Sequence, residues 1–150
     1  DDLGLVPAIE YLVREVKART GLQANFSSHG EQHRLDSLIE TVVFRVAQEG
    51  LTNIIRHAGV EKAELELVFS RDQVRLGVCD EGKGFDPSEV FYPPRGLGLA
   101  GMRERVEAVN GQLEIKSSPG QGCCLHIFIP LQNEEQPIQM DISEADLHRT

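Results

Sequence analysis

Apolar residues recur at helical spacing in three parts of the chain, residues 5–20, 38–58 and 97–110. Within each segment they lie three or four positions apart, which builds one apolar stripe along a helix. Each segment is followed by a glycine, the residue that most readily ends a helix: Gly21, Gly59 and Gly111. The pattern therefore predicts three helices, and residues 38–58 carry the strongest signal.

Shorter segments between these helices have the features of β-strands. Apolar and polar residues alternate in 63–69 and 74–79, and the short connection between them fits a hairpin. Strands are also predicted at 22–28, 112–117 and 123–129. The order helix, strand, helix, hairpin, loop, helix, hairpin indicates an α+β fold. We expect a two-layer α/β sandwich in which helices cover one face of a mostly antiparallel sheet.

The end of the chain differs from the rest. Residues 132–150 contain five acids and one Arg and have no apolar stripe that could join a core. We expect a flexible acidic C-terminal tail there, and one folded domain over residues 1–131. The only methionines are Met102 and Met140, so the chain is expected to be part of a longer protein.

Composition narrows the classes of function. The net charge of −9 argues against a nucleic-acid binder, which needs a basic face. No stretch approaches the roughly 20 apolar residues of a membrane span, and we expect a cytoplasmic domain. Cys79, Cys123 and Cys124 lack the spacing of a zinc site, and we expect them to be reduced and buried.

Three polar residues interrupt the apolar stripe of the helix predicted at 38–58. Glu49, Asn53 and His57 follow one another at intervals of four residues, which places them on or near the apolar face. Because burying unpaired polar groups is costly, either a polar network within the protein or a bound ligand must satisfy them. In a ligand pocket, Glu49 could orient a water or a proton, and the Asn53 carbonyl oxygen could bind Mg²⁺.

A second polar group follows the strand at 74–79, in the string Asp80-Glu81-Gly82-Lys83-Gly84. Alternation along the strand points Asp80 toward the helices, where its carboxylate needs a donor such as the exocyclic amine of adenine. Gly82 and Gly84 would let the chain turn sharply and let a base approach the backbone. The alternative is an ordinary Asp-Gly turn.

A glycine-rich string, Gly96-Leu97-Gly98-Leu99-Ala100-Gly101, opens the helix predicted at 97–110. Such a string exposes backbone N–H groups and the positive end of the helix dipole to an anion. It matches the dinucleotide pattern GxGxxG, but no strand precedes it, since residues 91–95 contain two prolines. A phosphate-binding loop outside a Rossmann unit therefore fits better.

Together these features resemble the ATP-binding domain shared by histidine kinases, gyrase, Hsp90 and MutL, the GHKL superfamily. Glu49-xxx-Asn53 resembles its N box, and the strings at 80–84 and 96–101 resemble its two glycine boxes. Gln48-Glu49-Gly50-Leu51-Thr52-Asn53 and Gly101-Met102-Arg103-Glu104-Arg105 are similar to the nitrate-sensor and degradation-sensor branch of sensor histidine kinases. The resemblance covers residues 1–131 and makes residues 1–4 the remnant of a linker from dimerization helices.

The resemblance implies the Bergerat ATP-binding fold, with a mixed sheet, and gives roles to matching positions. Asn53 would ligate Mg²⁺, Asp80 would read the adenine amine, and Glu49 would be the catalytic acid–base residue. The other implied ATP-binding residues are Arg56, His57, Gly82, Gly84, Gly96, Leu97, Gly98, Leu99, Gly101 and Cys123. Arg56 and Arg95 would supply charge near the phosphates unless they are ordinary surface arginines, and 85–95 would form a lid.

Two positions depart from the pattern of that branch. Gly50 stands where an alanine is usual, which costs roughly 1 kcal/mol inside a helix with no gain that the sequence reveals. Cys123 replaces a threonine that helps to hold the base. Because a thiol is a weaker donor than a hydroxyl, the nucleotide affinity should be lower than is typical.

The resemblance implies an enzyme, a protein-histidine kinase, of which this chain is the catalytic domain. Its phosphoacceptor histidine would lie on a dimerization domain before residue 1, and none of the five histidines here has a suitable context. We therefore expect the chain to bind Mg·ATP without autophosphorylating, and to be monomeric when isolated. The full protein, a homodimer, would pass the phosphoryl group to that histidine and then to a response regulator. The alternative is an ATP-binding regulatory switch or an anti-sigma-type serine kinase of the same superfamily.

Overall fold

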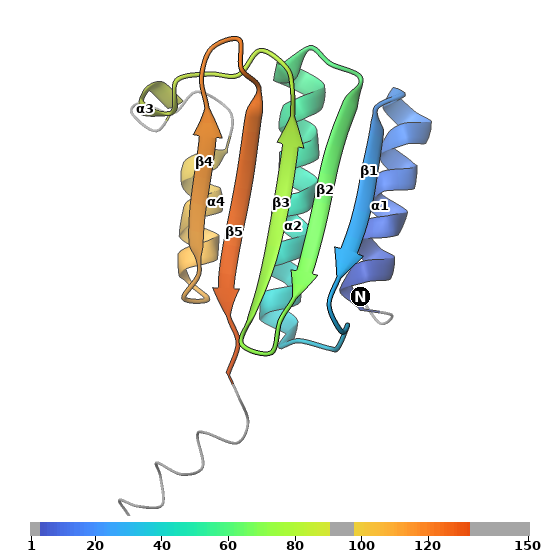
Figure 1. The fold of residues 1–150 in the computed structure, drawn as a ribbon, viewed down its shortest axis with the longest axis vertical. Coiled ribbons are helices and arrows are strands. Elements are labelled where there is room, and N and C mark those ends of the chain that lie inside the picture. The colour runs from blue at the N-terminus through green and yellow to red at the C-terminus, as the bar shows by residue number, and fades with distance from the viewer. Residues whose placement is uncertain (1–3, 91–97, 133–150) are drawn as a thin grey trace, which may run out of the picture.

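The computed structural model describes residues 4–90 and 98–132, which form two layers (Figure 1). A five-stranded sheet carries helices on one of its faces. The elements are, in chain order, α1 (Leu5–Thr20), β1 (Gln23–His29), α2 (Ser37–Asn53), the π-helical turn η1 (Ile54–Ala58), β2 (Lys62–Phe69), β3 (Gln73–Asp80), α3 (Pro87–Val90), α4 (Leu99–Glu107), β4 (Gln112–Ser117) and β5 (Cys123–Pro130). The predicted α+β sandwich is confirmed.

The sheet is mixed, with the strand order β1-β2-β3-β5-β4. β1 runs parallel to β2, and such a pair needs a crossover connection, which α2 provides. The pairs β2–β3, β3–β5 and β4–β5 are antiparallel. This arrangement agrees with the expected mixed, mostly antiparallel sheet, and it puts the end of β3 beside the start of β5.

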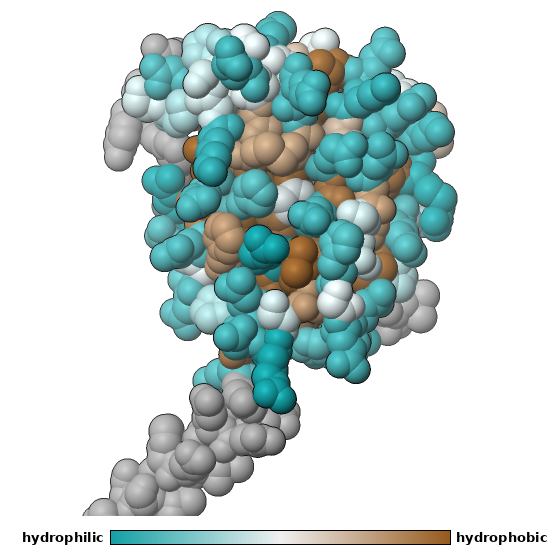
Figure 2. Space-filling model, viewed as in Figure 1, coloured by the Kyte–Doolittle hydropathy of each residue, from teal (hydrophilic) through white to brown (hydrophobic). Residues whose placement is uncertain are grey.

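The core lies between the helices and the inner face of the sheet. Along β2 the inward positions are buried and the outward ones mostly exposed, as the alternation of apolar residues predicted. Fully buried side chains come from both layers and include Ile9, Val43, Leu51, Leu67, Met102 and Ile127. The outer face of the sheet points to solvent, and Figure 2 shows mainly hydrophilic side chains there, with smaller apolar patches between them. None of the described helices is long and apolar enough to cross a membrane.

The helix predicted at 38–58 changes character in its last turn. It is α-helical to Asn53, and η1 then continues it as a π-helix up to Gly59, which adopts a left-handed conformation with φ 72°. A π-helical turn is wider than an α-helical one, so side chains beyond Asn53 are displaced from the positions that regular periodicity predicts.

The helix predicted at 97–110 is shorter in the structure. α4 begins at Leu99, and Leu97 lies outside the described residues. The helix ends at Glu107 because the chain turns at Asn110, whose φ is 66°, and the Gly111 N–H donates to the Val106 carbonyl at 2.9 Å.

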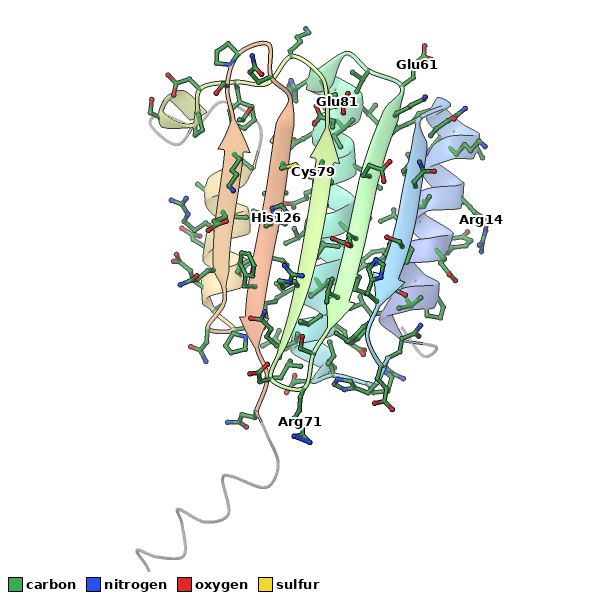
Figure 3. All side chains as sticks on the ribbon, in the orientation of Figure 1. Arg14, Glu61, Arg71, Cys79, Glu81 and His126 are labelled. Atoms are coloured by element: carbon green, nitrogen blue, oxygen red, sulfur yellow. A yellow bond between two sulfur atoms is a disulfide. The ribbon has the colours of Figure 1, made fainter. Side chains whose placement is uncertain are left out.

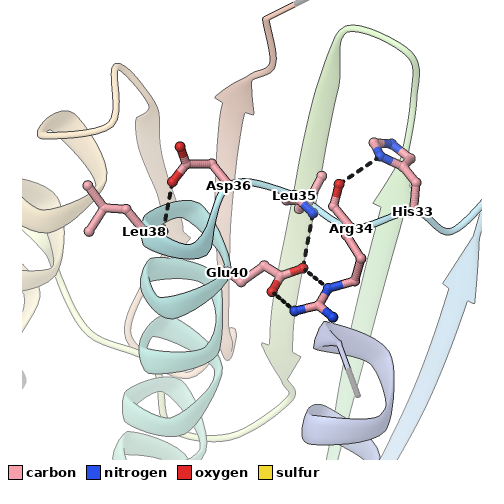
Figure 4. A network of polar contacts seen from close by, with 6 residues as sticks. All are labelled: His33, Arg34, Leu35, Asp36, Leu38 and Glu40. Atoms are coloured by element: carbon pink, nitrogen blue, oxygen red, sulfur yellow. Dashed lines mark hydrogen bonds and ion pairs between the residues drawn. The ribbon is translucent and has the colours of Figure 1, made fainter. Parts of the chain in front are cut away.

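The first turn of α2 is fixed by a network of polar contacts (Figure 4). Asp36 caps the helix by accepting a hydrogen bond from the Leu38 N–H at 2.9 Å. Glu40 is buried, and its carboxylate accepts two hydrogen bonds of 3.1 Å from Arg34 and one of 3.0 Å from the Leu35 N–H. Burial raises the pKa of Glu40, but the hydrogen bonds from Arg34 and Leu35 outweigh it and bring that pKa below its ordinary value.

Cys79 and Cys124 form a disulfide between β3 and β5, so the expectation of three reduced cysteines is wrong. The two residues stand opposite each other in the antiparallel register, with their Cα atoms 4.1 Å apart. They belong to the outer face of the sheet, where Figure 3 labels Cys79 on β3. The pair could not be read from the sequence because it depends on which strands are neighbours. Cys123 is the free cysteine of the three.

Candidate functional site

A pocket lies between the second half of α2, the start of α4, the end of β3 and the start of β5. It is lined by Gly50, Asn53, Ile54, His57, Ala58, Val78, Asp80, Gly84, Phe85, Leu99, Cys123 and Leu125. Most of these side chains are apolar and a few are polar, which is the usual composition of a small-molecule site. The pocket brings together six residues that the sequence singled out: Asn53, His57, Asp80, Gly84, Leu99 and Cys123.

Asn53 and His57 reach the pocket from the helical layer. Asn53 is the last α-helical residue of α2 and is half-buried. His57 lies on the π-helical turn and is exposed, so it stands at the rim of the pocket rather than inside it. The apolar stripe that these residues interrupt faces the sheet, as the sequence pattern predicted.

The end of β3 places Asp80 on the pocket wall. Its Oδ1 atom accepts a hydrogen bond from the Gly82 N–H at 2.8 Å, which shapes the turn that follows. The Lys83 N–H donates to the Ala58 carbonyl at 3.0 Å and ties this turn to η1. A side chain at Gly82 would collide with the Ala58 backbone, so the approach requires glycine. An Asp-Gly turn and a pocket-facing carboxylate are therefore both present.

Cys123 stands opposite Asp80 in the register of β3 and β5 and lines the same pocket. Burial and the nearby Asp80 carboxylate raise the pKa of the Cys123 thiol to about 11, although a hydrogen bond with Ser117 acts in the other direction. At neutral pH the pocket therefore meets a protonated thiol at this position, which is a weak hydrogen-bond donor.

A second, more polar hollow adjoins the pocket. It is lined by Leu12, Val16, Arg19, Gln48, Glu49, Thr52, Asn53, Ile55, Arg56 and Gly98. Asn53 lines both spaces and so stands between them. Gly98 is the N-cap of α4 and has a left-handed φ of 69°, which brings the amino end of α4 to this hollow. Glu49 and Arg56 belong to the hollow and not to the apolar pocket.

Glu49 is paired with Arg105, to which the sequence pattern gave no role. Arg105 Nη1 donates to both carboxylate oxygens of Glu49, at 3.1 and 3.2 Å. Because Glu49 is on α2 and Arg105 is on α4, the ion pair links the two helices beside the hollow. Glu49 Oε1 also lies near Gly98, at 3.9 Å from the position that a Cβ on this glycine would take.

Arg19 lines the hollow, and the sequence pattern did not single it out either. Its only signal was its place in the last turn of α1, where basic residues are common because they complement the helix dipole. Arg19 is on α1 and Arg105 is on α4, whereas the N box is on α2. The sequence pattern alone does not show that these three helices meet here.

The structure explains why a glycine occupies position 50, which the sequence did not reveal. It is buried on α2, and a Cβ at this position would lie 3.1 Å from Val78 Cγ1, a tight contact for which Val78 would have to shift by a few tenths of an ångström. The missing side chain lets α2 approach β3 where both line the pocket. The close approach of α2 to β3 is thus a structural reason for glycine at this position.

One further predicted residue, Gly101, lies apart from the pocket. Gly101 is exposed on α4 and lines neither space. Gly96, Leu97 and Arg95 fall outside the described residues. Among the residues that are described, no three His, Cys, Asp or Glu side chains gather in a way that could hold a metal. Asn53 offers a side-chain oxygen at this site, and Mg²⁺ is usually bound by few protein groups together with substrate phosphates.

The chain is similar to proteins of known type. The family model described as histidine kinase-, DNA gyrase B-, and HSP90-like ATPase matches residues 39–133. The chain is 34% identical over 135 residues to the signal transduction histidine-protein kinase/phosphatase DegS of Brevibacillus brevis, covering 90% of this chain and 34% of that protein. It is 36% identical over 135 residues to the oxygen sensor histidine kinase NreB of Staphylococcus carnosus (strain TM300), covering 87% of this chain and 38% of that protein. The chain thus spans little more than a third of the length of these relatives.

Solved structures share the fold. The Erythrobacter litoralis EL346 blue-light activated histidine kinase superposes with a TM-score of 0.68 at 20% identity, over 88% of this chain and 43% of that one. The Acinetobacter baumannii histidine kinase AdeS superposes with a TM-score of 0.66 at 18% identity, over 85% and 64% of the two chains. The resemblance to the ATP-binding domain of sensor histidine kinases is confirmed by the family match and the curated relatives. The chain belongs to the histidine kinase-, DNA gyrase B- and HSP90-like ATPase family.

Proposed function

We propose that this chain binds Mg·ATP in the pocket between α2 and the sheet and serves as the catalytic domain of a protein-histidine kinase. The observation that carries the proposal is the position of Asn53, which lines both the apolar pocket with Asp80 and the polar hollow with Glu49 and Gly98. A nucleotide is likewise apolar at its base and strongly charged at its phosphates, so one molecule can occupy both spaces.

The base would lie in the apolar pocket. Asp80 would accept a hydrogen bond from the exocyclic amine of adenine, a donor that guanine does not offer at that position. Phe85 and Leu125 line the same pocket and can pack against the ring. Selectivity for adenine over guanine therefore depends on the single carboxylate of Asp80.

The phosphates would extend past Asn53 into the hollow. The backbone N–H groups at the amino end of α4, beginning at Gly98, suit an anion, and Arg19 and Arg56 add positive charge. The Asn53 side-chain oxygen would ligate Mg²⁺ beside them. When bound, Mg²⁺ neutralises phosphate charge, and its other ligands would be phosphate oxygens and water.

The phosphoacceptor would enter through the hollow. An imidazole nitrogen of a histidine outside this chain would attack the γ-phosphorus, the bond from that phosphorus to the bridging β–γ oxygen would break, and ADP would leave. Glu49 stands in the hollow and can accept the imidazole proton. The phosphoryl group would then pass to a response regulator. Because that histidine belongs to a dimerization domain, we expect this chain alone to bind nucleotide as a monomer without autophosphorylating.

Calorimetric titration of the 150-residue chain with a non-hydrolysable ATP analogue tests the proposal. We expect saturable one-site binding that strengthens on adding Mg²⁺, and weaker binding of the matching GTP analogue. Absence of binding at millimolar ATP analogue with Mg²⁺ present would contradict the proposal. Equal binding of the two analogues would contradict the role given to Asp80.

A further inference from the structure

We infer that Arg105 is a positioning residue for the phosphate end of the site and that it acts through Glu49. The inference rests on the proposed function, because it concerns the same bound nucleotide. Arg105 lines neither the pocket nor the hollow, so the inference does not rest on a direct contact between Arg105 and ATP. What singles it out is the pair of hydrogen bonds, 3.1 and 3.2 Å long, from its Nη1 atom to both oxygens of Glu49.

Glu49 presents an electrostatic problem for a phosphate site. Its carboxylate lies in the hollow close to Gly98, the residue at which the amino end of α4 would meet the phosphates. Two negative groups so close together repel each other, even where water reaches them and weakens the repulsion. The site therefore needs a cation that compensates Glu49 and keeps its carboxylate turned away from the phosphates until a proton must be accepted.

Arg105 is placed to meet that need. It lies on the second turn of α4 and contacts the Glu49 carboxylate, while it is not among the residues that line the hollow. A single guanidinium nitrogen bridging both oxygens restricts the orientation of the carboxylate. Arg19 and Arg56 line the hollow and remain available to the phosphates, so the three cations have separate tasks.

The ion pair between Arg105 and Glu49 is partly exposed to solvent, so it should contribute little to the stability of the fold. The side chains of Arg105 and Glu49 are 40% and 32% exposed, and ion pairs of this exposure contribute little to stability because water screens them. The apolar residues of α4, Leu99, Met102 and Val106, hold the helix in the core without the pair. Removing Arg105 should therefore change ligand recognition more than folding.

The test compares ADP with a non-hydrolysable ATP analogue, both with Mg²⁺, on the full chain and its variants by calorimetric titration. Arg105→Ala should weaken binding of the ATP analogue about tenfold more than binding of ADP, because only the analogue brings the γ-phosphate close to Glu49. The Arg105→Lys variant should bind the ATP analogue with an affinity between those of the wild type and the Arg105→Ala variant. The double variant Arg105→Ala with Glu49→Gln should recover most of the lost affinity, since the uncompensated charge is gone. Arg71→Ala, on the turn between β2 and β3 (Figure 3), is the charge-matched control.

Three results would overturn the inference. If Arg105→Ala weakened ADP and the ATP analogue equally, in step with a lower melting temperature, Arg105 would be merely structural. If Glu49→Gln failed to restore binding, Arg105 would contact the phosphates itself or act through another residue. If Arg105→Ala bound both nucleotides like the wild type, it would have no role in recognition. Failure of the proposed function looks different, because the wild-type chain would then bind neither nucleotide.

Discussion

Asp80 and Cys123 face each other across β3 and β5, one position beyond the disulfide that joins Cys79 to Cys124. Both line the pocket that we propose for the nucleotide, so one pair of opposed residues contributes to the polar character of the end where adenine would lie.

Replacing Asp80 by Asn should cost the chain its preference for adenine. The amide keeps the size of the side chain but adds a donor, which opposes the adenine amine and suits the guanine carbonyl. We expect the affinity for the ATP analogue to fall by about tenfold or more, with little loss for the GTP analogue. Competition titrations of the two analogues measure this. Glu81→Gln, at the exposed neighbour labelled in Figure 3, should leave both affinities unchanged.

Replacing Cys123 by Thr should strengthen nucleotide binding. The thiol is a weak donor and stays protonated at neutral pH, since burial and Asp80 raise its pKa to about 11. A hydroxyl of similar size donates and accepts better, and we expect roughly a threefold to tenfold gain in affinity for the ATP analogue. Cys123→Ala separates the two contributions, because it removes the donor altogether and should bind no better than the wild type.

Gly50 and Val78 can be tested as a pair. Alanine at position 50 gains about 1 kcal/mol of helix propensity but crowds Val78, which costs a comparable amount. We expect Gly50→Ala to be close to neutral in the wild type and to stabilise the Val78→Ala variant by about 1 kcal/mol. Urea unfolding of the four proteins gives the coupling. Equal effects of Gly50→Ala in both backgrounds would contradict the contact.

The disulfide should stabilise the chain by roughly 2–4 kcal/mol, because it closes a loop between residues 45 positions apart. Cys79→Ser and addition of a reductant should therefore lower the free energy of unfolding by similar amounts. The reductant should have no further effect on the variant. Cys123→Ser keeps the bridge, so its unfolding should remain sensitive to the reductant.

Glu40 should make the free energy of unfolding depend on pH in the acidic range. Its pKa in the folded chain lies below the ordinary value of 4.5, so its contribution is present above that pH and is lost as the pH falls through the folded pKa. We expect Glu40→Gln to be less stable than the wild type by roughly 1–3 kcal/mol at pH 7, with the gap narrowing below pH 4.5. Urea unfolding between pH 3 and pH 7 measures this. Glu61→Gln, at an exposed acid (Figure 3), should show no such gap.

The sequence predicted the layers and half of the residues that line the pocket, because both follow from local patterns. Asn53 was found because it interrupts an apolar stripe, and Asp80 because it ends an alternating strand. Arg105 and the Cys79–Cys124 bridge were missed because their partners come from distant segments, and neither periodicity nor spacing shows which helices or strands meet. The close approach of Gly50 to Val78 was missed for the same reason, since it depends on the distance between α2 and β3.

The strand order has a consequence for how the chain acquires its pocket. β3 and β5 are separated along the chain by α3, α4 and β4, yet they pair directly and together form one wall of the site. Such non-local pairing carries a large loop-closure cost and slows folding. No partly folded form in which β5 has not reached β3 can hold a nucleotide at Asp80 and Cys123. Nucleotide binding during refolding would therefore mark the moment at which the sheet is complete.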